Sequence, residues 1–534
     1  MNSPSLSGTR QIARAAGTVM AAMVLSQLIG LVAKSLLAGA FGTQTESDAF
    51  FAANRFSEIL FNLVAGGALA SAFVPTFTGL LSREDHPGAW KLASSVANVI
   101  LLLLSALALG AAVFAPQVVQ YILAPGWTTS SPEKEALAVQ LLRIQLPSAV
   151  IFGLSGLVMG ILNAHQVFLY SSLAPAMYQL GWIFGLLALA PSMGVFGLAW
   201  GVVIGSVLHL VLQLPALLRL AGRRFYPTLG LDFPPLREVI RLMGPRLVSV
   251  GVTQLNFLLN TALASSPAWL PLTMPDGSVS AISLAFPLMI MPQAAIAQSI
   301  GIASLPTFSA QAARGRVDEL RASLAATLRG VLLLSLPASV GLILLRVPVV
   351  QLIYGHGEFD ARSVELVSWA LLWYAAGLVG HSLLEVVTRA FFALKDTRTP
   401  TLVTTIAMGL NLAFSVGFAI LFGVLGWLPH GGLALANSLA TFLEVGTLLV
   451  LLRRKAGGLG GRRVLAALVQ AGLAVAGMGL ALAGWLNLAA GRAAGLVALG
   501  GVALGGAVYG LLLIVQRVDE VRWALGVIRR RLGR

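Results

Sequence analysis

The chain has 534 residues, of which 57% are hydrophobic and only 10% are charged, whereas a soluble domain carries about 25% charged residues. We therefore predict an all-α polytopic membrane protein with membrane lipids as partners. The net charge of +15 does not indicate nucleic acid, because the basic residues lie between apolar segments, where membrane topology places them. The lack of cysteine excludes disulfides and thiolate chemistry.

Fourteen apolar segments are long enough to cross about 30 Å of hydrocarbon. They lie near residues 17–40, 48–77, 92–122, 137–163, 167–190, 195–218, 238–263, 280–309, 322–354, 364–393, 400–424, 430–452, 462–487 and 493–516. The first segment is too long for the apolar region of a signal peptide, so we predict an uncleaved helix.

Lysine and arginine gather in alternate loops. If the N-terminus is cytoplasmic, the inner loops and tails hold most of the 35 basic residues, and the outer loops hold Lys134, Arg362 and Arg492. The positive-inside rule then predicts that both termini are cytoplasmic. The basic tail, residues 517–534, is predicted to form an amphipathic helix on the inner leaflet.

Two short sequences recur at an offset of 231 residues. VPTFT at 74–78 matches LPTFS at 305–309, and VVQ at 118–120 matches VVQ at 349–351. Six predicted spans separate the copies, and an even number preserves orientation, which indicates parallel repeats. The predicted parts are an N-lobe of six spans (1–228), a C-lobe of six spans (229–456), two further spans (457–516) and the tail (517–534).

Motifs for catalysis or cofactors are absent. The sequence contains no GxxxxGK[ST] phosphate loop, no HExxH metal motif and no GxSxG nucleophile motif, so we expect no cofactor and no nucleotide site. The loop at 354–360, YGHGEFD, could support acid–base chemistry, but a tight turn that ends a helix is the favoured interpretation.

Ionisable residues inside apolar spans are costly and often functional. Lys34 and Arg55 lie near mid-span in consecutive helices, and Glu58, one turn beyond Arg55, could neutralise it. For each of these charges there are two alternatives: an ion pair that fixes helix packing, or a long side chain that reaches the membrane interface. Glu385 lies one turn before Arg389, which predicts a local ion pair. A cationic cavity would suit a lipid with a phosphate head. The candidate substrate-binding residues are Lys34, Arg55, Glu58, Asn62, Arg143, Arg246, Gln254 and Asn256.

Several stretches resemble the MurJ (MviN) lipid II flippase family. They are SDAFF at 47–51, GA at 67–68, AFVP at 72–75, SLPTFS at 304–309, LPASVGL at 336–342, YGHGEFD at 354–360 and AFFALKDTRTP at 390–400. The resemblance implies the multidrug/oligosaccharidyl-lipid/polysaccharide (MOP) exporter fold with two extra helices. It also implies a transporter, not an enzyme, which moves undecaprenyl-diphosphate-linked lipid II across the bacterial inner membrane by alternating access. Cell-wall synthesis machinery is the implied protein partner.

The chain departs from the family at several basic positions. Lys34-Ser35 replaces the family's Arg-Asp, and lysine keeps the charge without the bidentate phosphate grip. The family's arginine pair falls on Phe61 and Asn62, its acidic residue on Gly66, and its helix-eight arginine on Pro287. Three alternatives therefore stay open: a flippase for another lipid-linked glycan, a membrane glycosyltransferase or polymerase on the same carrier, and a scaffold without transport.

Overall fold

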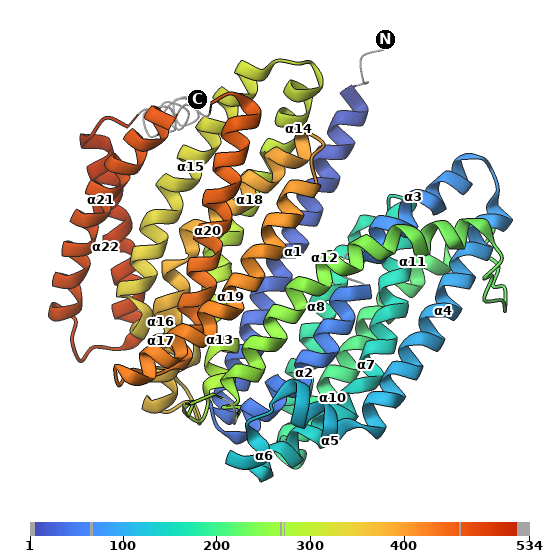
Figure 1. Cartoon of the computed structure of the whole chain (residues 1–534), viewed down its shortest axis with the longest axis horizontal. Coiled ribbons are helices and arrows are strands. Elements are labelled where there is room, and N and C mark those ends of the chain that lie inside the picture. Colours follow the sequence, from blue (N-terminus) through green and yellow to red (C-terminus); the bar gives the residue numbers. More distant parts are fainter. Residues whose placement is uncertain are drawn as a thin grey trace. The chain divides into compact units, whose positions relative to one another are not determined.

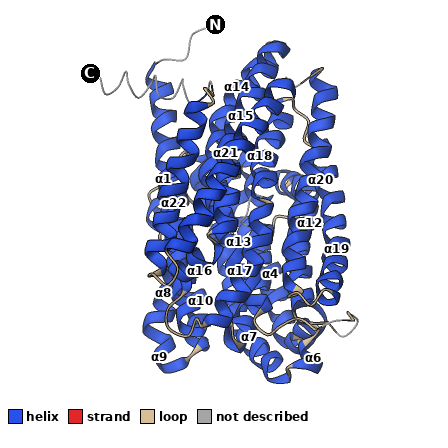
Figure 2. Cartoon of the chain, turned by 90° about the vertical axis from the view of Figure 1, so that its left-hand side faces the viewer, coloured by secondary structure: helices blue, strands red, loops and turns tan. Residues whose placement is uncertain are grey.

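The computed structural model describes residues 6–64, 68–267, 270, 271, 273–458, 461–518 and 520. Within this part of the chain the regular structure is entirely helical (Figure 2), which confirms the predicted all-α class. The chain forms two compact units, residues 1–269 and 270–534, and each is described by itself below.

The first unit is built on α7, against which α2, α3, α4 and α10 pack. Helix α12 packs on α3 and α2 and so belongs to this unit. The helices, coloured blue to green in Figure 1, are α1 (Leu6–Phe41), α2 (Thr45–Val64), α3 (Ala68–Ser82), α4 (His86–Val113), α5 (Ala115–Val118), η1 (Val119–Leu123), α6 (Trp127–Ser130), α7 (Pro132–Ala164), α8 (Phe168–Phe184), η2 (Gly185–Leu189), α9 (Ala190–Met193), α10 (Val195–Val211), α11 (Leu214–Leu218) and α12 (Pro234–Ala264).

Local sequence explains how these helices begin and how closely they pack. The Asp85 carboxylate accepts a hydrogen bond from the Gly88 N–H at 2.8 Å, and Pro87 occupies the first turn of α4; both features favour a helix N-terminus. Helices α8 and α10 meet at glycines. A Cβ at Gly181 would lie 2.1 Å from the Cα of Gly205, so only glycine permits this separation of the two backbones.

The second unit contains a buried core between α14, α15, α18 and α20. The last two helices, close to the predicted segments 462–487 and 493–516, pack on each other, and α21 packs on α15. The helices are α13 (Ser278–Gln293), η3 (Ala294–Gln298), α14 (Ser299–Ala313), α15 (Val317–Leu344), α16 (Arg346–Tyr354), α17 (Ala361–Ala376), α18 (Leu378–Ala393), α19 (Arg398–Val424), α20 (His430–Ala456), α21 (Gly461–Leu488) and α22 (Ala494–Val515).

Among the described residues, 11 helices are long and apolar enough to cross a membrane, or 12 if α17 and α18, bent by 44°, form one span. The predicted count of fourteen is not confirmed. The two predicted segments outside this set, 48–77 and 238–263, both contain positions that the structure does not describe fully: residues 65–67 in the first, and the side chains of 245, 246, 248 and 249 in the second.

Candidate functional site

The centre of the candidate site is an ion pair on one face of α2. The Arg55 guanidinium lies 2.7 Å from a carboxylate oxygen of Glu58, one helical turn away. The Arg55 side chain is 18% exposed and that of Glu58 is 37% exposed. Glu58 is the more exposed of the two, so the ion pair neutralises Arg55 and stays partly accessible.

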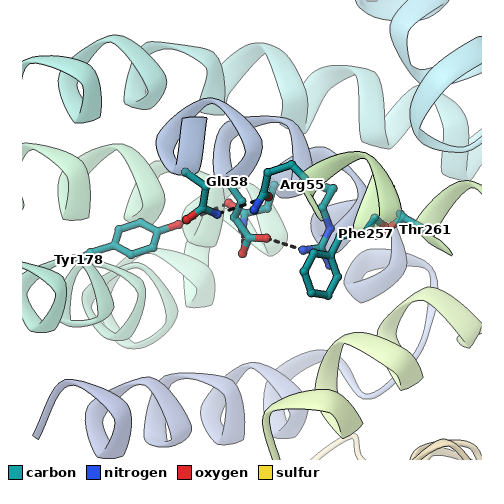
Figure 3. A network of polar contacts seen from close by, with 8 residues as sticks. Arg55, Glu58, Tyr178, Phe257 and Thr261 are labelled. Atoms are coloured by element: carbon teal, nitrogen blue, oxygen red, sulfur yellow. Dashed lines mark hydrogen bonds and ion pairs between the residues drawn. The ribbon is translucent and has the colours of Figure 1, made fainter. Parts of the chain in front are cut away.

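Two neighbouring helices hold this ion pair in place (Figure 3). Asn54 donates to the second Glu58 oxygen at 3.0 Å, and the Tyr178 hydroxyl, from α8, donates to Asn54 at 3.5 Å. On the other side, the Arg55 guanidinium lies 5.6 Å from the centre of the Phe257 ring of α12, a cation–π distance. The Nε of Arg55 is buried and has no hydrogen-bond partner within the described structure.

Lys34 joins the same cluster from α1. Its ammonium interacts electrostatically with both Glu58 and Arg55, and its side chain is half-buried. The three groups carry two positive charges and one negative charge, so Glu58 can neutralise only one of the two cations. The excess charge favours an anionic ligand.

Polar side chains extend the site from α2 to α12. Asn62 donates to the Gln254 side chain at 3.5 Å, which is the upper limit for a hydrogen bond. Asn256 is buried and accepts from Asn260 at 3.1 Å. For the polar side chains of the 238–263 segment the sequence leaves two alternatives, interhelical hydrogen bonds or the wall of a cavity. The structure shows one bond between α2 and α12 and one within α12.

Two of the predicted site residues, Arg143 and Arg246, are not shown in the charged cluster of α1 and α2. The Arg143 side chain is exposed, and its Nε donates at 3.0 Å to the carbonyl of Ala112 in the last turn of α4. A cation at this position interacts favourably with the negative end of the α4 helix dipole. The side chain of Arg246 lies outside the described part of the structure.

Phe61, one of the positions expected to depart from the family pattern, lies against a phenylalanine and a histidine. The Phe61 ring packs 4.6 Å from Phe152 and 6.0 Å from His209. His209 is buried and bonds to Ser155 at 2.6 Å, and Gln213 donates to Ser155 at 2.8 Å. Sequence reasoning missed this network; its only local signal was the helical spacing of His209 and Gln213. Pro287 lies inside α13, and residue 66 is not described.

A buried ion pair was also missed. Lys134 is predicted in a loop on the outer side, but the structure places it in the first turn of α7, with its Nζ 3.0 Å from Asp48; the outer side stays a prediction. The two side chains are 2% and 3% exposed, and the Trp127 ring lies 5.5 Å from the ammonium. Asp48 belongs to the SDAFF sequence, so this motif fixes the start of α2 against α7.

The remaining predictions concern the second unit. Glu385 and Arg389 form the predicted local ion pair, at 2.6 Å. Glu444 of α20 accepts a hydrogen bond from Thr404 of the neighbouring helix α19. The 354–360 loop ends at Asp360, which caps α17 by accepting from the Ser363 N–H at 2.8 Å. Among the described residues no group of histidine and acidic side chains could hold a metal ion.

Comparison with known sequences identifies similar proteins. The model of the family described as "Lipid II flippase MurJ" matches residues 37–497. A lipid II flippase MurJ of Burkholderia cenocepacia is 31% identical over 445 residues, which cover 80% of this chain and 83% of that protein. A probable lipid II flippase MurJ of Rhizobium tropici is 29% identical and covers 82% of this chain and 80% of its own length.

Solved structures share the fold. A lipid II flippase MurJ in an inward closed conformation aligns with a TM-score of 0.77 at 24% identity, covering 97% of this chain and 99% of that chain. An inward-facing multidrug-resistance MATE transporter of the MOP superfamily aligns with a TM-score of 0.65 at 17% identity, covering 81% of this chain and 94% of that chain. Below 25% identity, these similarities concern the fold alone.

Proposed function

Because this chain belongs to the lipid II flippase MurJ family, we propose that it moves lipid II from the inner to the outer leaflet of the bacterial inner membrane by alternating access. The family consists of transporters, and the chain is a multi-pass membrane protein. The observation that carries the proposal at the level of residues is the cluster of Lys34, Arg55 and Glu58, with its excess positive charge.

The diphosphate of the lipid would bind to this cluster. An unpaired cation at the centre of a bilayer costs roughly 2.5–3.5 kcal/mol on insertion scales, and a diphosphate supplies the missing counter-charge. The buried Nε of Arg55 is one donor that such an anion could satisfy after a small movement of Glu58. Asn62, Gln254 and Asn256 would form a polar wall beside it, and contacts by Arg143 and Arg246 stay predictions.

The proposed architecture has fourteen spans with both termini cytoplasmic. Counting α2 with α3 as one span and α12 as another would raise the number from twelve to fourteen. The sequence repeat supports two parallel lobes, residues 1–228 and 229–456, followed by two spans in 457–516 and the basic tail. Reporter fusions test this proposal: we expect an exterior signal at Lys134, Asp276 and Arg362 and a cytoplasmic signal at Arg224, Arg316 and Lys455.

Because the sequence contains no nucleotide motif, the energy for transport would come from the membrane potential, an ion gradient or downstream consumption of the precursor. Of these, we propose the membrane potential. Moving one charge across 100 mV is worth about 2.3 kcal/mol. In an inside-negative cell this energy would return the empty cationic site towards the cytoplasm. Collapse of the potential with an ionophore should therefore slow repeated transport more than the first binding of substrate.

The deciding experiment is rescue of cells depleted of their own lipid II flippase. We expect the wild-type chain to restore growth, and Lys34→Ala and Arg55→Ala each to fail at normal expression, because either change removes the excess charge. Lys34→Arg should restore growth because it keeps the cation. Arg492→Ala, which removes an exposed cation outside the cluster, is the matched control. Normal precursor export by both alanine variants would contradict the cationic-site mechanism.

A second candidate is a flippase for another lipid-linked glycan on the same carrier. The specific observation is Phe61, which packs on Phe152 and His209 where the family places an arginine. If this candidate is right, the chain will not rescue the depleted cells. Purified protein in vesicles would then transport a different undecaprenyl-diphosphate glycan and leave lipid II in place.

A further inference from the structure

The second unit contains a pocket that the transport proposal does not use. It lies between α16, α17 and the turn from α19 to α20, and its volume is about 560 Å³, within the usual range for small-molecule sites. Its lining includes Arg346, Glu365, Ser368, Trp369 and Trp427. Two indoles, two charged groups and a hydroxyl thus line one cavity.

The chain turn at the end of α19 builds one wall of the pocket. Gly426 has a φ of +73°, a left-handed conformation that favours glycine. Its N–H donates to the Gly423 carbonyl at 3.1 Å, and the Trp427 N–H donates to the Phe422 carbonyl at 2.8 Å. This pattern is a Schellman motif, and the accompanying apolar contact joins Trp427 to Phe422 at 5.2 Å. Trp427 is therefore fixed although it is 46% exposed.

Trp369 forms the second aromatic wall and is equally constrained. Its Nε1 donates to the Leu428 carbonyl at 3.0 Å. A Cβ at Gly431 would lie 2.3 Å from the same nitrogen, so α20 begins in close contact with this ring. The Trp369 and Trp427 rings lie 5.8 Å apart at 79°. The pocket therefore presents two fixed indoles that are almost perpendicular to each other.

The charged groups of the pocket are not equivalent. Glu365 is paired with Arg362 at 2.7 Å, so its charge is neutralised. The NH1 of Arg346 donates to the Ile343 carbonyl at 2.8 Å, and no acidic side chain pairs with Arg346 among the described residues. The half-buried Arg346 guanidinium therefore retains donors for a carboxylate in a bidentate arrangement.

We propose that this pocket binds a carbohydrate that carries a carboxylate group. A pyranose ring has an apolar C–H face that can stack on an indole, and its hydroxyls can bond to Ser368 and Glu365. Arg346 would pair with the carboxylate. The predicted topology places Arg362, and hence this end of the unit, on the outer side of the membrane. The alternative is that the tryptophans only anchor the protein at the membrane interface.

The test compares two sugars that differ in one group. N-acetylmuramic acid carries a lactyl carboxylate, and N-acetylglucosamine has the same ring without it. Binding to the purified full chain in nanodiscs is measured by saturation-transfer NMR, which does not depend on transport. We expect N-acetylmuramic acid to bind about tenfold more tightly, as a charged hydrogen bond implies. Arg346→Gln should abolish this preference and leave N-acetylglucosamine binding unchanged.

A second pair of variants tests the stacking wall. Trp427→Ala should weaken the binding of both sugars about fivefold, which is the magnitude expected for loss of an aromatic contact. Trp200→Ala, which removes a 44% exposed tryptophan of the first unit, should leave binding unchanged. If Trp427→Ala does not fold, the proposal is tested by Arg346→Gln alone, through its effect on the preference for N-acetylmuramic acid over N-acetylglucosamine. Absence of saturable binding, or a preference that survives Arg346→Gln, would overturn the proposal and leave the tryptophans as interfacial anchors.

Discussion

Replacement of Lys134 by methionine should destabilise the first unit far more than loss of an ordinary surface charge. The change removes the ammonium that lies 3.0 Å from Asp48 and leaves the carboxylate 3% exposed. Methionine has a similar length and no charge, so the packing volume is nearly kept. The loss therefore reports mainly on the buried charge.

The magnitude follows from the distance and the burial. With an effective dielectric constant of 20, two charges 3.0 Å apart attract each other by ~5.5 kcal/mol, and desolvation of both groups opposes this attraction. Removing one partner of a buried pair costs about 3–5 kcal/mol, since the other charge stays buried and loses its ion-pair partner. The double change Asp48→Asn with Lys134→Met should cost less than Lys134→Met alone.

The assay is the free energy of unfolding from denaturant titration in detergent, followed by tryptophan fluorescence. Arg362→Met is the matched control, because its pair with Glu365 is 49% and 58% exposed and should contribute about 0.3–0.5 kcal/mol. Equal losses for Lys134→Met and Arg362→Met would refute the reasoning. So would a double variant less stable than Lys134→Met.

One further prediction concerns the pH dependence of stability in the second unit, at the end that the predicted topology places in the cytoplasm. Another concerns a tightly packed glycine in the first unit. The Lys455 ammonium, 2.6 Å away, lowers the pKa of Asp396 to about 2. A lowered carboxyl pKa stabilises the fold above the unfolded value of 3.8, and this contribution is lost as the pH falls towards 2. The Tm difference between wild type and Asp396→Asn should therefore be constant above about pH 5 and be largely lost by about pH 2; a difference unchanged at low pH would contradict this. In the first unit, a Cβ at Gly126 would lie 1.9 Å from the Ser265 carbonyl oxygen, so Gly126→Ala should lower Tm. Gly110→Ala, where a Cβ meets open space, should not lower it.

Local patterns account for the part of the structure that the sequence predicted. Apolar runs located most helices, including α21 and α22, because helix formation depends on nearby residues. The ion pair of Glu385 and Arg389 was predictable from a spacing of four residues. The same spacing logic related Glu58 to Arg55, and the structure shows them paired.

Contacts between distant residues could not be predicted in this way. Lys134 looked like a loop cation because its neighbours are polar, and nothing near it in sequence points to Asp48, which lies 86 residues away. The network of Ser155, His209 and Gln213 is similar, since Ser155 lies on α7 whereas His209 lies on α10 and Gln213 in the turn after it. Such pairings depend on how the helices pack, which a single sequence does not encode locally.

The assignment of α12 to the first unit has a consequence for biosynthesis. Asn62 emerges from the ribosome 192 residues before Gln254, its hydrogen-bond partner. During that interval α2 must enter the membrane without α12 beside it, so the insertion machinery has to shelter a polar helix face. A gene divided after residue 269 should therefore yield two co-expressed fragments that reassemble more readily than fragments divided after residue 228.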